Sequence, residues 1–505
     1  MLITHFSKTG DYNDFFESIF AFGLGAATVS LISKIAGGLY AKTADIGGDI
    51  LVMKELKKFN EDDDNNPVSI YDKIGDNVGG IAGIATDSFS TLALALCSAL
   101  YIASTSEELV NAGGYYYPLL IIANGILICI FSTGVTSLLS SFISSRYSLY
   151  YLLIFQMLFS VVLVLPTFYL IAKNFIPETY NIGRKGSIMY KEDINLFETM
   201  LCPIAGLING LFISAISYYY TAKSNRPVSQ VLEATKQGST INIIFGLALG
   251  YISTMVPTIL IAGTLFYTYY LLDMFGISLC ALGILSTIPV YIAIDASATV
   301  ADNSIGLGIL CGMRQSPIEN LKKVEITCNS FGKGYIFASS SMVSLSLMGS
   351  YVIISKLVDI DVNTPLIFAG LLIGAMIPYY FSATVLKLLT NGAIELIKII
   401  KQQRQEIVSS ELAHQSNEES NNKYHEVLIN NSVKKLFYPC FVIFILPIKI
   451  GLLFGVKAIA GLLLGLIISG MQLGISSYVS GIAWKNCKSS INGMFDLFIL
   501  LYYFN

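Results

Sequence analysis

Residues 72–102, DKIGDNVGGIAGIATDSFSTLALALCSALYI, pass from an acidic start into a long apolar run. Within 79–102 the one charged residue is Asp87. A helix of this length, at about 1.5 Å per residue, crosses a hydrocarbon layer about 30 Å thick. Asp72 and Asp76 precede the run, stand four residues apart and share one helical face. The stretch therefore predicts a transmembrane helix that begins beside two carboxylates.

The whole chain repeats this apolar pattern. Its 505 residues are 54% hydrophobic and 13% charged, against about 25% charged residues in soluble domains. We predict an all-α polytopic transmembrane helix bundle in a lipid bilayer, built as a single integral membrane domain over 1–505. About eleven runs are long enough to span the bilayer, namely 15–39, 79–102, 117–143, 148–172, 197–222, 240–270, 276–300, 330–356, 365–390, 434–452 and 457–483.

The basic residues orient these spans. If the segment after 15–39 is cytosolic, 21 of the 31 Lys and Arg residues fall on the cytosolic side, as the positive-inside rule requires. The same topology makes 401–433 a polar cytosolic loop, flexible or partly helical. The start has no charged region followed by a cleavage site, so no removable signal peptide is expected. The eight cysteines form no CxxC pair, which argues against a zinc site or a disulfide framework.

Ionisable residues gather at the predicted cytosolic helix ends. In GGLYAKTADIGGDI (37–50), spacings of three or four residues put Lys42, Asp45 and Asp49 on one face. The other members are EDDDNNP (61–67), Asp72, Asp76, Asp295 and Asp302 in DASATVADN (295–303), and Lys333 in GKG (332–334). Because all of them fall on one side of the membrane, we expect a single charged site there.

Carboxylates at this spacing, with lysines nearby, suit a magnesium–phosphate compound. Mg²⁺ takes one or two carboxylates together with phosphate oxygens, and lysines neutralise phosphate charge that the metal leaves. The chain has neither a GxxxxGK[ST] loop nor a kinase signature, so a nucleotide is not indicated, and no nucleic-acid partner is expected. The alternative interpretation is that these acids are solvated helix ends.

Several long segments resemble the membrane-bound inorganic pyrophosphatases, which couple diphosphate hydrolysis to proton or sodium transport. They occur in the family's order over nearly the whole chain. They are GGLYAKTADIGGD, EDDDNNPVSIYDKIGDNVG, YYYTAKSNRPVSQVLEATKQGSTINIIFGLALGY, LGILSTIPVYIAIDASATVADN, FGKGYIFASSSMVSLSL and ISGMQLGISSYVSGIAWKNCK. Relative to the family pattern, the chain is expected to start after several upstream helices and to end before the last one.

The resemblance implies a role for each matched residue. Lys42 and Lys333 correspond to diphosphate ligands, and the ligands of the Mg²⁺ cofactor correspond to Asp45, Asp49, Asp72, Asp76 and Asp302. Asp87 corresponds to the ion-path aspartate and Lys34 to its basic partner. A carboxylate within a span is costly, so Asp87 is a functional-site hypothesis even without the family. The alternative is a structural Asp87, protonated or hydrogen-bonded between helices.

The chain also departs from the family pattern inside well-matched segments. Gly80 stands where GDNVGD has an aspartate that holds the attacking water, and the companion aspartate belongs to the expected last helix. No catalytic residue is therefore assigned, and hydrolysis is expected to be impaired. Asn329 matches neither residue type that sets potassium dependence. The remaining departures are Leu94 for a glutamate, Ile309 for an acid, Ile326 for the asparagine of GNTT and Lys485 for the aspartate of WDN.

Three function hypotheses follow. The first is the family activity, a pyrophosphate-energised proton pump with weakened hydrolysis. The second is a non-catalytic protein that binds Mg-diphosphate or regulates an intact paralogue. The third is a passive channel through the old ion path. The resemblance also implies a homodimer, or a heterodimer with a paralogue, in a vacuolar or acidic organelle membrane.

Overall fold

The computed structural model describes residues 12–54, 68–142, 148–183, 190–313, 315–357, 360–409 and 417–488. The acidic segment 61–67 lies outside these ranges. The long helices are α2 (Tyr12–Lys54), α4 (Gly83–Ala103), α6 (Tyr116–Phe142), α7 (Ser148–Phe175), α8 (Leu196–Thr221), α10 (Ser239–Ser253), α11 (Met255–Leu285), α12 (Ile288–Leu310), α13 (Gln315–Ile354), α14 (Pro365–Ser409), α16 (Phe437–Phe454) and α17 (Val456–Lys488). The shorter elements are α3 (Ser69–Gly75), the π-helix η1 (Asp76–Ala82), α5 (Glu107–Ala112), β1 (Thr179–Ile182), β2 (Lys191–Asn195), α9 (Arg226–Thr235), α15 (Asn417–Ile429) and the π-helix η2 (Asn430–Lys434).

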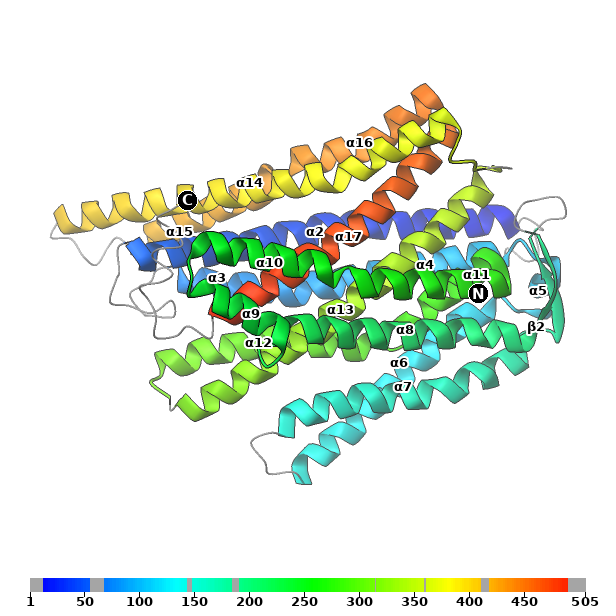
Figure 1. The fold of residues 1–505 in the computed structure, drawn as a ribbon, viewed down its shortest axis with the longest axis horizontal. Helices are drawn as coiled ribbons and strands as arrows, with labels where there is room; N and C mark the ends of the chain where they lie inside the picture. The colour runs from blue at the N-terminus through cyan, green and yellow to red at the C-terminus, as the bar shows by residue number, and fades with distance from the viewer. Residues whose placement is uncertain are drawn as a thin grey trace.

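The predicted all-α polytopic bundle is confirmed. Within the described ranges, ten helical stretches are long and apolar enough to cross a membrane. One of them, Ser239–Leu285, contains a break at Leu272 and Asp273, where the backbone leaves the helical region. The chain reverses direction there, so the second part of α11 and α12 return to the end where α10 begins (Figure 1). This break accounts for the separate runs predicted at 240–270 and 276–300.

The two ends of the bundle differ in character. At one end, on the left of Figure 1, lie α3, α9, α15 and the last turns of α12. These elements belong to the segments that the basic residues assign to the cytosol. Much of the predicted loop 401–433 is helical in the described residues, as the end of α14, α15 and η2. At the opposite end lie α5 and the antiparallel pair β1–β2, a small sheet that the sequence did not predict.

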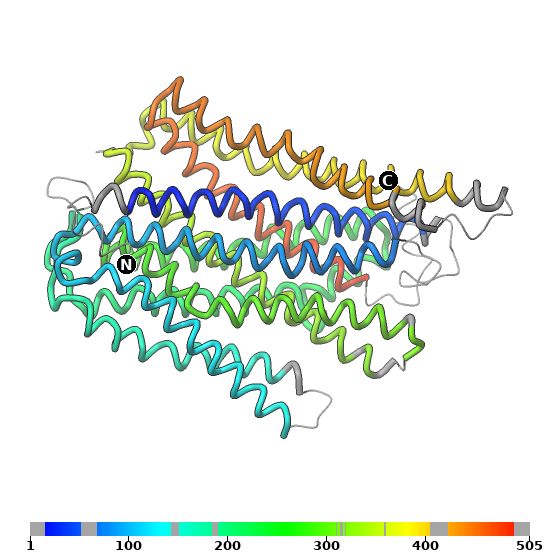
Figure 2. The backbone as a smooth tube through the Cα atoms, turned by 180° about the vertical axis from the view of Figure 1, so that it is seen from behind, coloured from blue at the N-terminus to red at the C-terminus, as the bar shows by residue number. Residues whose placement is uncertain are grey.

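The core surrounds the second part of α11. Its residues from Leu279 to Leu285 are fully buried against α8, α13 and α4. Gly206 of α8 lies directly against the backbone of Cys280, so the two helices approach closely. Figure 2 shows α2, in dark blue, running the length of the molecule beside α4, while the α6–α7 hairpin in cyan extends away from the centre. This arrangement carries the charged segment of α2 to the cytosolic end.

Glycines also join α14 to α17. Gly370 and Gly374 on α14, and Gly461 and Gly465 on α17, each form a GxxxG pair. A Cβ atom at any of the four would collide with backbone atoms of the facing helix. Small residues at this spacing allow membrane helices to pack backbone to backbone. The contact fixes the course of α17, whose last turns reach the cytosolic end.

We expect Gly374→Leu to lower the thermal unfolding temperature of the detergent-purified protein. The added side chain must displace the Leu462 backbone, and such overpacking costs about 2–3 kcal/mol. The matched control is Gly263→Leu on α11, where no atom lies within reach of an added Cβ. Equal melting temperatures for the two variants would contradict this packing.

Candidate functional site

The charged residues predicted from the sequence meet at the cytosolic end of the bundle. Lys42 of α2 donates to Asp45 on the same helix, with Nζ 2.7 Å from Oδ2. Asp49, one turn further along α2, accepts from Lys488 of α17 through both carboxylate oxygens, at 2.8 and 2.7 Å. Asp302 of α12 lies 3.4 Å from the Nζ of Lys485 on α17. The last turns of α17 thus hold two of the five predicted metal ligands.

Glu325 and Lys488 are members of this cluster that the sequence reasoning missed. The Nζ of Lys485 lies 2.8 Å from Oε1 of Glu325, a buried residue on α13. A signal for Lys488 existed, because it stands three residues after Lys485 and shares its helical face. No local signal pointed to Glu325, because its partner Lys485 comes from a distant part of the chain. We call the set Lys42, Asp45, Asp49, Asp72, Asp76, Asp302, Glu325, Lys485 and Lys488 the acid–lysine cluster.

Asp72 and Asp76 form one side of the cluster. Among the described residues, neither carboxylate contacts a lysine of the cluster. Asp72 is 9% exposed, and within the described residues its Oδ1 has no hydrogen-bond partner, while Lys73 lies 3.5 Å from Oδ2. Asp76 begins the π-helix η1, and its charge acts on those of Lys42, Asp302 and Lys485. π-Helical turns are rare and occur often at functional sites. Asp76 therefore lies on the same side of the cluster as Asp72, within electrostatic reach of charged groups on α2, α12 and α17.

These two carboxylates suit a magnesium ion that arrives with its phosphate ligand. No group of three His, Cys, Asp or Glu side chains in the described ranges is arranged to hold a metal by itself. Mg²⁺ commonly uses one or two carboxylates and completes its shell with water and substrate phosphates. The orphaned Oδ1 of Asp72, together with Asp76, fits that mode. Asp49 and Asp302, in contrast, already face ammonium groups.

Lys333 lies deeper in the bundle than the cluster. It stands two helical turns beyond Glu325 on α13, with its Nζ 5.9 Å from the centre of the Tyr478 ring. Asp295 lies two turns beyond Asp302 on α12, is 2% exposed, and has an Oδ2 without a partner among the described residues. The charges of Lys333 and Asp295 act on each other. This second layer is about 10 Å further into the bundle, at 1.5 Å per residue.

Lys34 and Asp87 form an ion pair deeper still. Lys34 of α2 donates to Oδ2 of Asp87 on α4. Asp295 connects this pair to the second layer, because its charge acts on both Lys333 and Lys34. Beside Asp87 is a cavity of about 10 Å³, lined by Ser88, Thr91, Ser339 and aromatic neighbours, which is the size of about one water. Beyond it, Leu94 packs against the apolar core.

Gly80 faces α12, where the sequence comparison expected a carboxylate. A Cβ atom at Gly80 would lie 2.9 Å from Oγ1 of Thr299. The adjacent Gly79 packs against Gly37 of α2, whose own added Cβ would lie 2.8 Å from the Gly79 Cα. Close helix contacts therefore occupy the space on both sides of this turn. No acidic side chain can stand here without moving Thr299.

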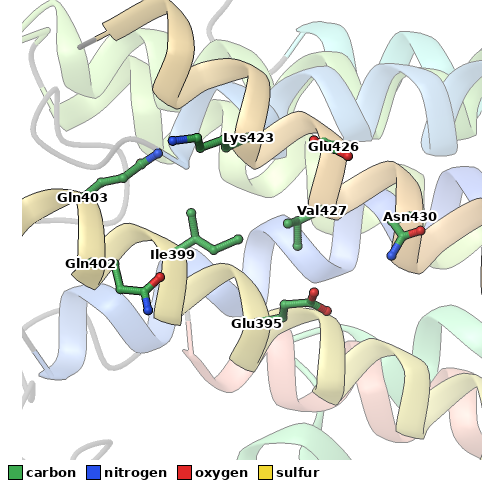
Figure 3. Close-up of a pocket in the computed structure, with 8 residues that line it drawn as sticks. All are labelled: Glu395, Ile399, Gln402, Gln403, Lys423, Glu426, Val427 and Asn430. Carbon is green, nitrogen blue, oxygen red and sulfur yellow. The ribbon is translucent and has the colours of Figure 1, made fainter.

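A separate cavity lies elsewhere at the same end. It has a volume of about 470 Å³ and lies between α14 and the α15–η2 segment (Figure 3). Figure 3 shows Ile399 and Val427 in the gap, with Glu395 nearby. Glu395 pairs with Lys435 at 3.2 Å. None of the residues in the acid–lysine cluster lines this cavity.

Comparison with known proteins identifies the family. The family described as inorganic H+ pyrophosphatase matches residues 1–496. A putative K(+)-stimulated pyrophosphate-energized sodium pump of Clostridium tetani is 28% identical, over 94% of this chain and 68% of its own length. A K(+)-insensitive pyrophosphate-energized proton pump of Methanosarcina mazei is 28% identical, over 94% of this chain and 69% of its own length. A K(+)-stimulated pyrophosphate-energized sodium pump of Thermotoga maritima is 27% identical, over 94% of this chain and 68% of its own length.

The match extends over nearly the whole chain, and the helical membrane fold agrees with it. The chain is an integral, multi-pass membrane protein that belongs to the inorganic H+ pyrophosphatase family.

Proposed function

We propose that this protein binds diphosphate as its magnesium complex at the acid–lysine cluster, and that it hydrolyses diphosphate slowly at best. The unpartnered Oδ1 of Asp72 and the carboxylate of Asp76, on which the charge of Lys42 acts, carry the proposal. Magnesium would neutralise phosphate charge there. Lys42 would donate to phosphate oxygens from the cluster, and Lys333 would do so from the deeper layer. The family match and the names of its relatives support diphosphate as the ligand.

Slow hydrolysis follows from the surroundings of Gly80. Attack on diphosphate needs a water whose proton passes to a base, and such a base typically contributes 10²- to 10⁴-fold to the rate. Gly80 offers no side chain, and Thr299 fills the adjacent space with a hydroxyl that cannot accept a proton at neutral pH. Other family members would have an aspartate here. The rate that remains would come from binding and charge neutralisation alone.

A second candidate is a non-catalytic partner of an intact paralogue. Two observations favour it: Gly80 lacks the base, and Lys485 introduces a positive charge among the metal ligands. Diphosphate binding would then stabilise one conformation of a dimer, and the partner chain would perform hydrolysis and transport. A vacuolar or other acidic organelle membrane would be the setting for a proton pump of this kind.

If this chain moves protons itself, the Lys34–Asp87 pair would be the proton-carrying group. To accept a proton, Asp87 must first release Lys34, whose ammonium would then need another carboxylate. Asp295 supplies one, since its charge already acts on Lys34. A change of charge in the second layer can therefore reach Asp87 without a rearrangement of the helices. Leu94 leaves the far side of Asp87 without an ionisable group at that position, which would slow proton exit.

We expect Asp76→Ala to weaken diphosphate binding at least about tenfold, or roughly 1.4 kcal/mol, because it removes one of two open metal ligands. Lys42→Met should weaken binding by a similar factor. Isothermal titration of the detergent-purified protein with diphosphate, in the presence of Mg²⁺, measures both. The control is Glu395→Ala, which removes a cytosolic carboxylate outside the cluster. Wild-type affinity in Asp76→Ala, or no binding by the wild type, would refute the proposed site.

We expect Asp87→Asn to destabilise the protein by about 1–3 kcal/mol, because it leaves the Lys34 ammonium without its partner inside the membrane. The double variant Lys34→Met/Asp87→Asn should recover much of the loss. Thermal unfolding of the four proteins in this cycle gives the coupling between the two residues. The surface pair Lys435–Glu395 provides the comparison, with an expected coupling below about 1 kcal/mol. Additive losses at Lys34 and Asp87 would show that the pair does not form.

A further inference from the structure

The end of α17 places positive charge among carboxylates from three other helices. Lys488 contacts Asp49 of α2, and Lys485 contacts Asp302 of α12 and Glu325 of α13. Both carboxylates contact the same atom, Nζ of Lys485, which lies 3.4 Å from Oδ2 of Asp302 and 2.8 Å from Oε1 of Glu325. The nitrogen therefore lies between two carboxylates that belong to different helices.

Asp302 and Glu325 would repel each other without a cation between them. Their side chains are 24% and 11% exposed, so water screens their charges only in part. Each charge also acts directly on the other. Among the ion pairs of the described residues, Lys485 is the cation that contacts either of them. The Lys485 ammonium thus contacts both negative charges directly, while the charge of Lys73 also acts on both.

We propose that Asp302 and Glu325 form a latent divalent-cation site that Lys485 keeps closed. Two carboxylates, partly shielded from water and converging on one point, are the usual protein contribution to a Mg²⁺ or Mn²⁺ site. The Lys485 ammonium takes that point. It supplies one positive charge and three hydrogen-bond donors, but no vacant coordination positions.

This inference concerns the protein alone and does not depend on diphosphate binding. It separates the cluster into two sides with different chemistry. The Asp72–Asp76 side retains a carboxylate oxygen without a partner. On the other side, the Lys485 ammonium already offsets the charge of Asp302 and Glu325, so added metal ions would not stabilise these carboxylates further. Residues that would otherwise bind a second cation instead fasten α17 to α12 and α13.

The test is Lys485→Met, which keeps the length of the side chain and removes its charge. In EDTA this variant should melt below the wild type, because Asp302 and Glu325 lose their shared cation. Millimolar Mg²⁺ should raise its melting temperature by on the order of 2–4 °C more than it raises that of the wild type. Manganese binding, followed by electron paramagnetic resonance, should show additional bound Mn²⁺ in the variant.

Two further variants keep the result interpretable. Lys485→Met/Glu325→Gln removes one carboxylate of the site, so it should regain stability in EDTA and lose the extra Mg²⁺ response. Lys435→Met breaks a pair with a single carboxylate, Glu395, and should gain no Mg²⁺ response. If Lys485→Met folds in Mg²⁺ but not in EDTA, that result would also support the proposal.

The proposal is overturned if Lys485→Met responds to Mg²⁺ and binds Mn²⁺ no more than the wild type does. It is also overturned if Lys485→Met fails to fold in both buffers while the double variant folds, because Mg²⁺ would then be unable to replace the ammonium. Failure of both variants contradicts it as well, since the double variant removes the charge repulsion to which the instability is attributed. A negative diphosphate titration would not affect these outcomes.

Discussion

Charge that is partly removed from water must be paired, and this constraint organises the cytosolic end of the bundle. Each unpaired buried charge costs several kcal/mol, so acids and lysines from distant parts of the chain hold one another in place. Lys488 connects the last described helix to the first through Asp49, and Lys485 connects it to α12 and α13. The glycine contacts between α14 and α17 bring these lysines to the right depth. Packing and charge therefore determine the position of α17 together.

The same constraint continues into the membrane as three successive layers. The outer acid–lysine cluster is followed by Lys333 and Asp295, and then by the Lys34–Asp87 pair. The charges of Lys42 and Lys485 act on Lys333, and the charge of Lys34 acts on Asp295, so neighbouring layers are linked electrostatically. Such linkage is the minimum that coupling between phosphate binding and proton movement requires. It would not require hydrolysis, so binding and turnover can be tested separately in this chain.

Much of this arrangement could be predicted from the sequence, because hydropathy and charge act locally. Apolar runs predicted the helices, basic residues predicted an orientation, and motif resemblance pointed to the acids. Other features depend on contacts between distant residues. Nothing near Glu325 indicates that Lys485 will face it from α17, and Gly80 does not reveal that Thr299 occupies the adjacent space. The depth of Lys333 and the break at Asp273 likewise follow from tertiary packing.

Phosphate release from diphosphate is the most direct measurement of the central claim, that this family member keeps a diphosphate site whose chemistry has been weakened. The detergent-purified protein would be assayed with Mg²⁺ beside Asp76→Ala, which removes an open carboxylate of the cluster. We expect the wild type to release phosphate only slightly faster than this variant, because binding and charge neutralisation act without a base. Release by the wild type about 10²-fold or more above that of Asp76→Ala would contradict the account, because it would require a base that the surroundings of Gly80 do not provide.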